Sequence, residues 1–255
     1  MIALDLIGIG TGNPRHLTLQ AIERINAADL ILIPTKGAEK DDLAGLRRQI
    51  CADVLTNPAT KVAEFALPVR DPAITDYRAR VDAWHDAIAA IWVETIRTHL
   101  GDGSRVAFLV WGDPSLYDST LRIADRVAAL LPLTVRVTPG ITSIQALTAA
   151  HAIPLNEING PVVVTTGRQI RDRGFPPGTD TAVVMLDGEL SFRRLDPEGL
   201  HIWWTGYAGM ENEISLAGPV ASVTEAIAEA RASARAAHGW IMDIYLLRRG
   251  TPPQG

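Results

Sequence analysis

Residues 2–14 read Ile-Ala-Leu-Asp-Leu-Ile-Gly-Ile-Gly-Thr-Gly-Asn-Pro, and this stretch decides the fold of the first half of the chain. A short apolar run that ends in glycines is typical of a buried strand, here residues 2–8, which a tight turn joins to a helix over residues 16–28. Ligands of open α/β sheets bind beyond the carboxyl ends of the strands. The stretch therefore predicts a parallel α/β sheet with one wall of a ligand site at its edge.

Two later loops repeat this design at the ends of predicted strands. Trp111-Gly112-Asp113-Pro114 follows a strand expected over residues 106–110, and Pro139-Gly140-Ile141-Thr142-Ser143 follows one expected over residues 133–137. Glycine allows a close approach of the backbone to a neighbour or a ligand, and Asp113 adds a carboxylate. Each loop alone is typical of a turn without a ligand. Three such loops together predict convergence on one ligand.

Strands and helices alternate as far as residue 114, which predicts a mainly parallel sheet with right-handed crossovers. Pro34 is expected to end the second strand, and Leu19 to lie on the inner face of the first helix. The strands expected here are residues 2–8, 30–33, 62–67 and 106–110, and the longest helix covers residues 75–100.

The second half of the chain has a different pattern. Strands over residues 162–166, 182–186 and 201–205 follow one another across long loops without predicted helices, which is typical of a mixed sheet. We therefore expect an α/β protein of two domains. The expected divisions are residues 1–114 with a mainly parallel sheet, residues 115–250 with a mixed sheet, and a frayed tail over residues 251–255.

Bulk properties restrict the location and the partners. The chain has 255 residues, enough for two α/β lobes, and a net charge of −5, which lacks the basic footprint of a nucleic-acid-binding protein. Cys51 is the single cysteine, so no internal disulfide forms, and the composition fits a reducing cytosol. No apolar run approaches the length of a membrane span. We expect a cytoplasmic protein without nucleic-acid or membrane partners.

The first glycine loop departs from the nicotinamide dinucleotide fingerprint. That fingerprint needs glycine at its first, third and sixth positions, and the sixth position here is Asn13, followed by Pro14. It also needs an acidic residue at the end of the second strand, whereas Asp29 precedes that strand. A phosphate-binding Gly-Lys-Ser/Thr sequence is absent as well. The loop pattern therefore argues against a dinucleotide ligand.

Together, the three loops resemble those of the tetrapyrrole (corrin/porphyrin) methyltransferase family, whose members use S-adenosylmethionine. Family members open with a strand, a Gly-x-Gly-x-Gly loop and a Leu-Thr pair, matched here by residues 8–12 and 17–18. They also carry Gly-Asp-Pro and Pro-Gly-Ile-Thr/Ser elements, matched by residues 112–114 and 139–143. The resemblance extends along nearly the whole chain. It implies a class III methyltransferase of two α/β domains, a homodimer without metal, with the cofactor held between the domains.

Matched residue by residue, the resemblance also implies a cofactor pocket. Thr11 stands where many relatives have proline, and Leu186 stands where several have methionine, a swap that conserves volume. The implied pocket residues are Thr11, Trp111, Gly112, Asp113, Leu116, Thr142, Ser143, Leu186 and Gly206.

Details of the first loop, of a helix with Trp84 and His85, and of residues 184–188 resemble one branch of the family. That branch methylates ring carbon C-1 of precorrin-5 and releases acetate by hydrolysis. Methyl transfer requires alignment above all, whereas hydrolysis needs a group that takes a proton from water. The candidates for this group are Asp113, Asp187, Glu189 and His16, and Asp113 and Asp187 are the predicted catalytic residues.

A corrinoid substrate carries many carboxylates, which guanidinium groups bind in bidentate fashion. Arg168, Arg171 and Arg173 follow one predicted strand, and Arg15 flanks the first glycine loop. We therefore expect Arg15 and Arg168 to contact a polyanionic corrinoid; the alternative is a solvated surface. Two other functions remain open: methylation of another substrate on the same fold, and binding of S-adenosylmethionine or S-adenosylhomocysteine without catalysis.

Overall fold

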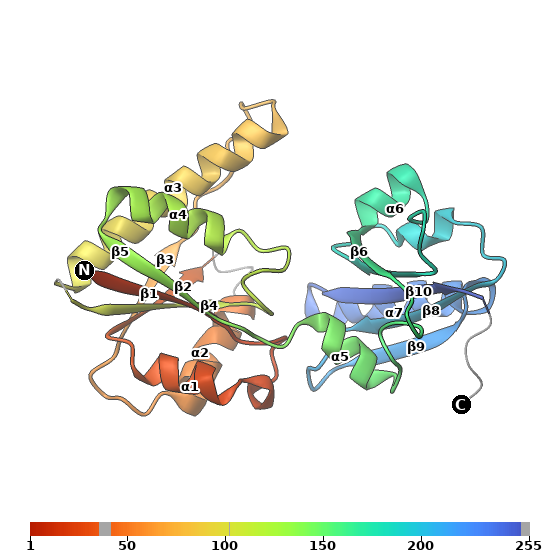
Figure 1. Cartoon of the computed structure of the whole chain (residues 1–255), viewed down its shortest axis with the longest axis horizontal. Helices are drawn as coiled ribbons and strands as arrows, with labels where there is room; N and C mark the ends of the chain where they lie inside the picture. Colours follow the sequence, from red (N-terminus) through yellow and green to blue (C-terminus); the bar gives the residue numbers. More distant parts are fainter. Residues whose placement is uncertain (36–41, 102, 251–255) are drawn as a thin grey trace. The chain divides into compact units, whose positions relative to one another are not determined.

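The computed structural model describes residues 1–35, 42–101 and 103–250 (Figure 1). The chain divides into two compact units, Met1–Thr142 and Ser143–Gly255. The expected frayed tail over residues 251–255 lies outside the described residues.

The first unit contains a five-stranded parallel sheet in the order β3-β2-β4-β1-β5. Helices α1 and α2 cover one face of this sheet, and α3 and α4 cover the other (Figure 1). The strands are β1 (Ile2–Gly8), β2 (Leu30–Thr35), β3 (Lys61–Ala66), β4 (Arg105–Val110) and β5 (Leu133–Thr138). The helices are α1 (Leu19–Asn26), α2 (Asp42–Val54), α3 (Tyr77–His99) and α4 (Thr120–Leu130), with a short 3-10 turn η1 (Pro14–His16).

Side chains along the central strands point alternately to the two faces of the sheet and pack into two separate cores. Leu4 and Leu6 of β1 pack beneath α3 and α4, whereas Ile7 and Ile9 pack beneath α1 and α2. Because both faces of the sheet are covered, its strands are apolar almost throughout, as expected for a parallel sheet.

The second unit contains a mixed sheet in the order β6-β7-β10-β8-β9, in which only the pair β6–β7 is parallel. Trp204, Phe192 and Tyr245 centre the core between this sheet and α6 and α7. The strands are β6 (Val162–Thr166), β7 (Thr181–Met185), β8 (Leu200–Gly206), β9 (Ile214–Pro219) and β10 (Asp243–Arg249). The helices are α5 (Ser143–Ala150), α6 (Gly167–Arg173) and α7 (Val220–His238), with a 3-10 turn η3 (Ser191–Arg194).

The boundary between the units differs from the one expected after residue 114. Strand β5 pairs with β1 over Ile2–Ile7, and α4 packs against α3, so both elements belong to the first unit. A buried carboxylate reinforces the pairing: Asp5 of β1 is 2% exposed and forms an ion pair with Arg136 of β5 at 2.5 Å. The division therefore falls after Thr142.

Two local expectations were wrong. Strand β2 continues through Pro34 to Thr35, because it pairs with β4 only as far as Leu32 and the missing N–H of Pro34 breaks no ladder there. Leu19 is 80% exposed, because α1 begins after the cap residue Thr18, whose hydroxyl accepts a hydrogen bond from Ala21 N. The buried face of α1 carries Ala21 and Ile25.

Candidate functional site: loops at the carboxyl ends of the strands

The three glycine loops follow three neighbouring strands and meet at one edge of the first sheet. Strands β4, β1 and β5 are adjacent and parallel, so their carboxyl ends point the same way. Gly10 and Gly112 form an antiparallel bridge: Gly112 N donates to Gly10 O at 2.8 Å, and Gly10 N donates to Gly112 O at 3.3 Å. The loops therefore contact one another directly.

Packing between these loops requires glycine at two positions. A Cβ added to Gly8 would lie 2.5 Å from Gly140 N and 2.8 Å from Gly112 O, and a Cβ on Gly140 would overlap Gly112 O. Gly112 itself has a φ of +65° and open space where a Cβ would lie. Glycine at residues 8 and 140 therefore allows the loop backbones to pack together, whereas the absence of a side chain at Gly112 leaves open space at this edge of the sheet.

Asp113 ties two of the loops together. Its Oδ1 accepts hydrogen bonds from Ser115 N at 2.8 Å and from Ser115 Oγ at 2.5 Å, and its Oδ2 accepts one from Gly140 N at 2.9 Å. Burial raises the pKa of Asp113, but these hydrogen bonds outweigh it and lower the pKa below its ordinary value. The carboxylate is therefore held ionised, with both oxygens occupied.

The other predicted pocket residues of the first unit surround this edge. Thr11 is 3% exposed, and its hydroxyl has no hydrogen-bond partner among the described residues. Such a group calls for an explanation, of which a bound ligand is one. Trp111, Leu116 and Thr142, which lie in the loops after β4 and β5, are half-buried.

The predicted pocket residues of the second unit also lie at one sheet edge. Strand β10 runs antiparallel to both β7 and β8, so the carboxyl ends of those two strands flank the start of β10. Leu186 follows β7, and Gly206 ends β8. Ser143 begins α5.

Leu186 has an unusual conformation for its residue type. Its φ is +54°, in the left-handed region, and its side chain is 67% exposed. Such a backbone costs a non-glycine residue about 1–2 kcal/mol. An exposed apolar side chain in a strained backbone is typical of a residue that contacts a ligand or partner.

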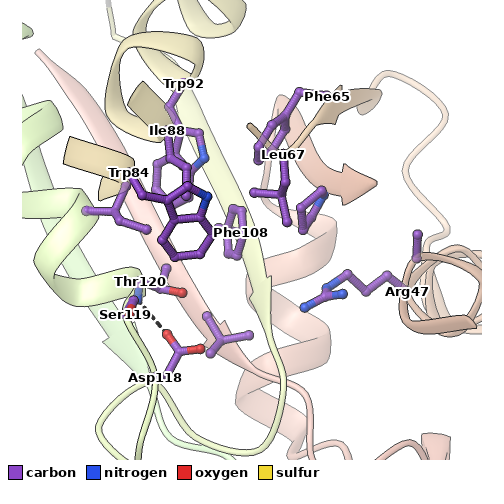
Figure 2. Close-up of a pocket in the computed structure, with 14 residues that line it drawn as sticks. Arg47, Phe65, Leu67, Trp84, Ile88, Trp92, Phe108, Asp118, Ser119 and Thr120 are labelled. Carbon is purple, nitrogen blue, oxygen red and sulfur yellow. Dashed lines mark hydrogen bonds between the residues drawn. The ribbon is translucent and has the colours of Figure 1, made fainter. Parts of the chain in front are cut away.

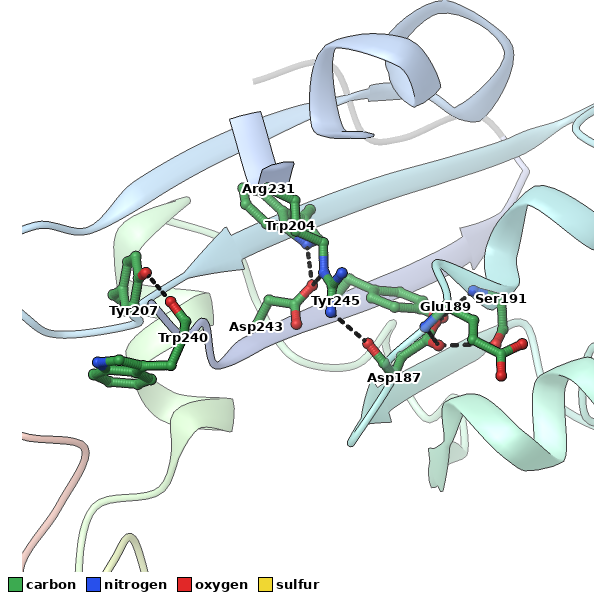
Figure 3. A network of polar contacts seen from close by, with 9 residues as sticks. All are labelled: Asp187, Glu189, Ser191, Trp204, Tyr207, Arg231, Trp240, Asp243 and Tyr245. Carbon is green, nitrogen blue, oxygen red and sulfur yellow. Dashed lines mark hydrogen bonds and ion pairs between the residues drawn. The ribbon is translucent and has the colours of Figure 1, made fainter. Parts of the chain in front are cut away.

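Asp187 anchors the loop that carries Leu186 (Figure 3). Its Oδ1 accepts from Glu189 N at 3.0 Å and Ser191 Oγ at 2.8 Å. Its Oδ2 accepts from Ser191 N and from the Tyr245 hydroxyl, both at 2.6 Å. Burial first, and then the charge of Asp187, raise the pKa of Tyr245, so the phenol stays protonated and remains a donor. Asp187 is buried, and each of these contacts holds the loop in place.

A second buried carboxylate supports the same loop. Asp243 Oδ2 accepts from Trp204 Nε1 and from Arg231 Nε, each at 2.9 Å, and Arg231 Nη2 donates to the backbone oxygen of Asp187 at 3.2 Å (Figure 3). Burial raises the pKa of Asp243, and the charge of Arg231 opposes that shift. Distant elements β8, β10 and α7 thus converge on the Leu186 loop, and no local motif signals this.

The predicted substrate arginines have unequal surroundings. Arg15 and Arg168 are exposed, on η1 and at the start of α6. Arg171 pairs with Asp172 at 2.9 Å and with Glu189 at 3.0 Å. Acidic neighbours therefore offset part of the basic cluster after β6.

A cavity of about 160 Å³, which no sequence motif indicates, lies within the first unit (Figure 2). Arg47 of α2 is 9% exposed in its wall, and its Nε donates to Leu109 O at 2.9 Å. The sequence gives one sign that Arg47 is buried: it stands three residues after Ala44 and three before Ile50, which are both buried on α2. The lining residues are Pro34, Ala44, Arg47, Phe65, Leu67, Trp84, Ile88, Trp92, Phe108, Val110, Asp118, Ser119, Thr120 and Ile123.

The family model of the Tetrapyrrole (Corrin/Porphyrin) Methylases matches residues 3–224. The chain belongs to the tetrapyrrole methylase family. This confirms the predicted family, and the two sheets confirm the predicted α/β fold with a parallel first sheet and a mixed second sheet.

Relatives of this methylase have names that refer to tetrapyrrole methylation or cobalamin synthesis. It is 51% identical, over 96% of its chain and 94% of the relative, to a Sinorhizobium protein named precorrin-6A synthase (deacetylating). It is 38% identical, with a TM-score of 0.83, to a crystal structure of a cobalamin-synthesis-related protein, CobF, from Corynebacterium diphtheriae; the match covers 98% of this chain and 100% of that chain. A uroporphyrin-III C-methyltransferase from Thermus thermophilus, complexed with S-adenosyl homocysteine, shares the fold at 17% identity and a TM-score of 0.58, over 96% of this chain and 92% of that chain.

No described helix is both long and apolar enough to cross a membrane. No group of three or more His, Cys, Asp or Glu side chains in the described ranges is arranged to hold a metal ion.

Proposed function

We propose that this methylase transfers the methyl group of S-adenosylmethionine to ring carbon C-1 of precorrin-5 and releases the acetyl group as acetate, giving precorrin-6A. The observation that carries the proposal is the 51% identity, over 96% of the chain, to the Sinorhizobium precorrin-6A synthase (deacetylating). The family match over residues 3–224 supports the same class of reaction.

The residues at the two sheet edges fit S-adenosylmethionine. The Thr11 hydroxyl is a buried polar group that lacks a partner among the described residues. A Cβ on Gly112 would meet open space, and Leu186 offers an exposed apolar surface. We assign the cofactor to Thr11, Trp111, Gly112, Leu116, Thr142, Ser143, Leu186 and Gly206. S-adenosylmethionine supplies an activated methyl group, so these residues need only bind it, orient it and exclude water.

Asp113 and Asp187 act as positioning residues in this proposal rather than as bases. Both oxygens of each carboxylate already accept hydrogen bonds from loop groups. The lowered pKa of Asp113 also makes it a weak proton acceptor. Asp113 holds the loop after β5 against the loop after β4, and Asp187 holds Leu186 in its strained conformation.

Substrate binding in the proposal uses the exposed guanidinium groups of Arg15 and Arg168. Such groups suit the peripheral carboxylates of a corrinoid, because each forms charge-assisted hydrogen bonds in a fixed planar geometry. We further propose a homodimer located in the cytoplasm, as the family resemblance and the single cysteine suggest.

A single reaction tests the proposed function. The protein is incubated with precorrin-5 and methyl-labelled S-adenosylmethionine, and the corrinoid product and free acetate are measured by mass spectrometry. We expect a product that carries one labelled methyl group and lacks the acetyl group, with one acetate released per methyl transferred. Labelled product without acetate would indicate another methylation, and binding of S-adenosylhomocysteine without any labelled product would indicate a non-catalytic protein.

A further inference from the structure

The first glycine loop contains two buried polar atoms that the protein leaves without a partner. They are the hydroxyl oxygen of Thr11 and Nδ1 of His16, and neither has a hydrogen-bond partner among the described residues. Over the same described ranges, no ion pair or ring contact involves the His16 imidazole either. Burying a polar atom without a hydrogen bond costs free energy, and such atoms in native proteins call for an explanation, of which a catalytic role is one. Both atoms therefore need a partner that the loop itself does not supply.

The backbone of this loop folds His16 against the contact between the glycine loops. Within the turn η1, His16 N donates to Asn13 O at 2.9 Å, and the Asn13 side chain accepts from Arg15 N at 2.9 Å. A Cβ built on Gly10 would lie 3.1 Å from the His16 Cβ, so the histidine packs directly against Gly10. Gly10 in turn forms the bridge to Gly112. His16 thus lies at the same edge of the sheet as the loop after β4.

Hydrolysis of an acetyl group needs a group that takes a proton from water. The sequence suggests four candidates, and three of them are occupied. Both oxygens of Asp113 and both oxygens of Asp187 accept hydrogen bonds from their own loops. Glu189 faces two arginines, with its oxygens 3.0 and 3.9 Å from their nitrogens. His16 is the candidate whose proton-accepting side chain is not already bonded within the described protein.

An imidazole suits this task by its chemistry. In its neutral form one ring nitrogen accepts a proton while the other donates a hydrogen bond, and histidine is the side chain that ordinarily changes its charge near neutral pH. The His16 side chain is half-buried, so packing against Gly10 orients the ring without enclosing it.

We propose that His16 is the catalytic base of the deacetylation, and that its imidazole takes a proton from the water molecule that attacks the acetyl carbon. This inference rests on the proposed function. The water oxygen forms a bond to the acetyl carbon, and the bond from that carbon to the ring breaks. Methyl transfer needs an electron pair on C-1, and loss of an acetyl group from C-1 leaves one there. That pair forms the bond to the methyl group, while the electron pair of the sulfonium–methyl bond stays on the sulfur of S-adenosylhomocysteine. Acetate leaves as an anion, and His16 passes its proton to solvent.

Two variants of His16 and one control test this role. His16→Ala removes the imidazole, and His16→Asn keeps a polar group near the position of Nδ1 but no base. His99→Gln is the matched control, because His99 ends α3 beside the start of β3, at the opposite edge of the sheet. Circular dichroism and thermal unfolding establish that each variant is folded, and His16→Asn decides the question if His16→Ala does not fold.

The readouts are acetate release and methyl transfer from precorrin-5 with methyl-labelled S-adenosylmethionine, and the affinity for S-adenosylhomocysteine by calorimetry. In both His16 variants, acetate release should fall about 100-fold or more, and methyl transfer should fall with it. The affinity for S-adenosylhomocysteine should stay at the wild-type value. Free imidazole should restore part of the activity of His16→Ala and leave the wild type and His99→Gln unchanged.

Two kinds of failure are distinguishable in this experiment. Acetate release near the wild-type rate in the His16 variants would overturn the base and leave the proposed function standing. Loss of activity together with loss of S-adenosylhomocysteine affinity, without rescue by imidazole, would also overturn it, because His16 would then serve the cofactor or the loop. A wild type that binds S-adenosylhomocysteine but releases no acetate would overturn the proposed function itself.

Discussion

At the scale of single residues, two carboxylates at strand ends hold loops in place. Asp113 and Asp187 each follow the end of a strand, and each accepts hydrogen bonds through both oxygens. A carboxylate at the carboxyl end of a strand is a natural candidate for a base when only the sequence is known. Its hydrogen-bond partners decide between a base and a clamp, and here they favour a clamp.

Asp113→Ala should weaken both the fold and the cofactor site. Removing the carboxylate leaves Gly140 N and the Ser115 groups without their acceptor, which should lower the free energy of unfolding by about 1–3 kcal/mol. The loop after β5 is then no longer held, so the affinity for S-adenosylhomocysteine should fall as well. Thermal unfolding and calorimetry measure the two effects. Ser115→Ala, which removes one donor only, is the control, and full cofactor affinity in Asp113→Ala would contradict the clamp.

His85 predicts a pH dependence of stability. It is 2% exposed, neither ring nitrogen has a partner among the described residues, and burial followed by the charge of Arg126 lowers its pKa from 6.5. The unfolded chain therefore binds a proton at pH values where the folded protein does not, so this residue costs stability as the pH falls through about 6.5 and below.

His85→Leu should remove that cost. We expect the variant to gain roughly 1 kcal/mol over the wild type near pH 5.5, with a smaller gain near pH 8. Urea unfolding at several pH values measures the difference. His99→Leu on the same helix is the control, because the His99 ring nitrogen already contacts Thr95 O at 2.8 Å. An equal gain at every pH would show that His85 does not titrate in this way.

At the scale of elements, the short loop after β7 combines a strained residue with an unusually complete set of supports. Hydrogen bonds from η3, β10 and α7 converge on Asp187, one residue after Leu186. Strain of this kind persists only where surrounding contacts enforce it. The support points to a requirement for the Leu186 side chain at the surface.

Leu186→Gly should therefore separate stability from binding. Glycine adopts a φ of +54° without strain, so the folded protein should keep its stability or gain up to about 1 kcal/mol. The affinity for S-adenosylhomocysteine should fall, because the apolar contact is lost. Ala152→Gly, at another exposed residue with a φ of +50°, is the matched control and should leave affinity unchanged. Unchanged affinity in Leu186→Gly would remove Leu186 from the cofactor site.

Sequence reasoning recovered elements with a strong local signal and missed those without one. The apolar runs of β1 and β4 and the stripe along α3 predicted their elements within a few residues. Helix α6 was missed because Ile170 is its only buried apolar side chain, and β9 because a Gly-Pro pair ends it.

The candidate site shows the same division between local and distant signals. The glycine loops were predicted because each is a local motif beside a strand. Arg47 and the partners of Asp187 could not be predicted, because α2, β10 and η3 meet those sites only after folding.

At the scale of the whole molecule, the first unit is complete only with its fifth strand. Strand β5 covers the edge of β1, and α4 adds Ile123, Ala124 and Val127 to the core beneath α3. Arg136 of β5 also neutralises the buried Asp5. An unpaired buried charge is strongly destabilising.

Residues 1–142 should accordingly fold alone, whereas residues 1–114 should not. The shorter fragment loses one side of the β1 ladder, part of the core and the partner of Asp5. Cooperative thermal unfolding and amide hydrogen exchange distinguish the two fragments. Arg136→Met in the longer fragment should lower its free energy of unfolding by about 3 kcal/mol. Cooperative unfolding of residues 1–114 would show that β5 is dispensable.

The close contact of Gly8, Gly112 and Gly140 has a consequence for redesign of the enzyme. Even one added methyl group at Gly8 or Gly140 meets the backbone of a neighbouring loop, and no side-chain rearrangement relieves that clash. These loops therefore form a frame of backbone contacts, and Gly8 and Gly140 have to be kept in any redesign. New substrates are to be sought by exchanging side chains around the frame. The walls of the Arg47 cavity offer the most freedom, because they are built from side chains carried on six separate elements.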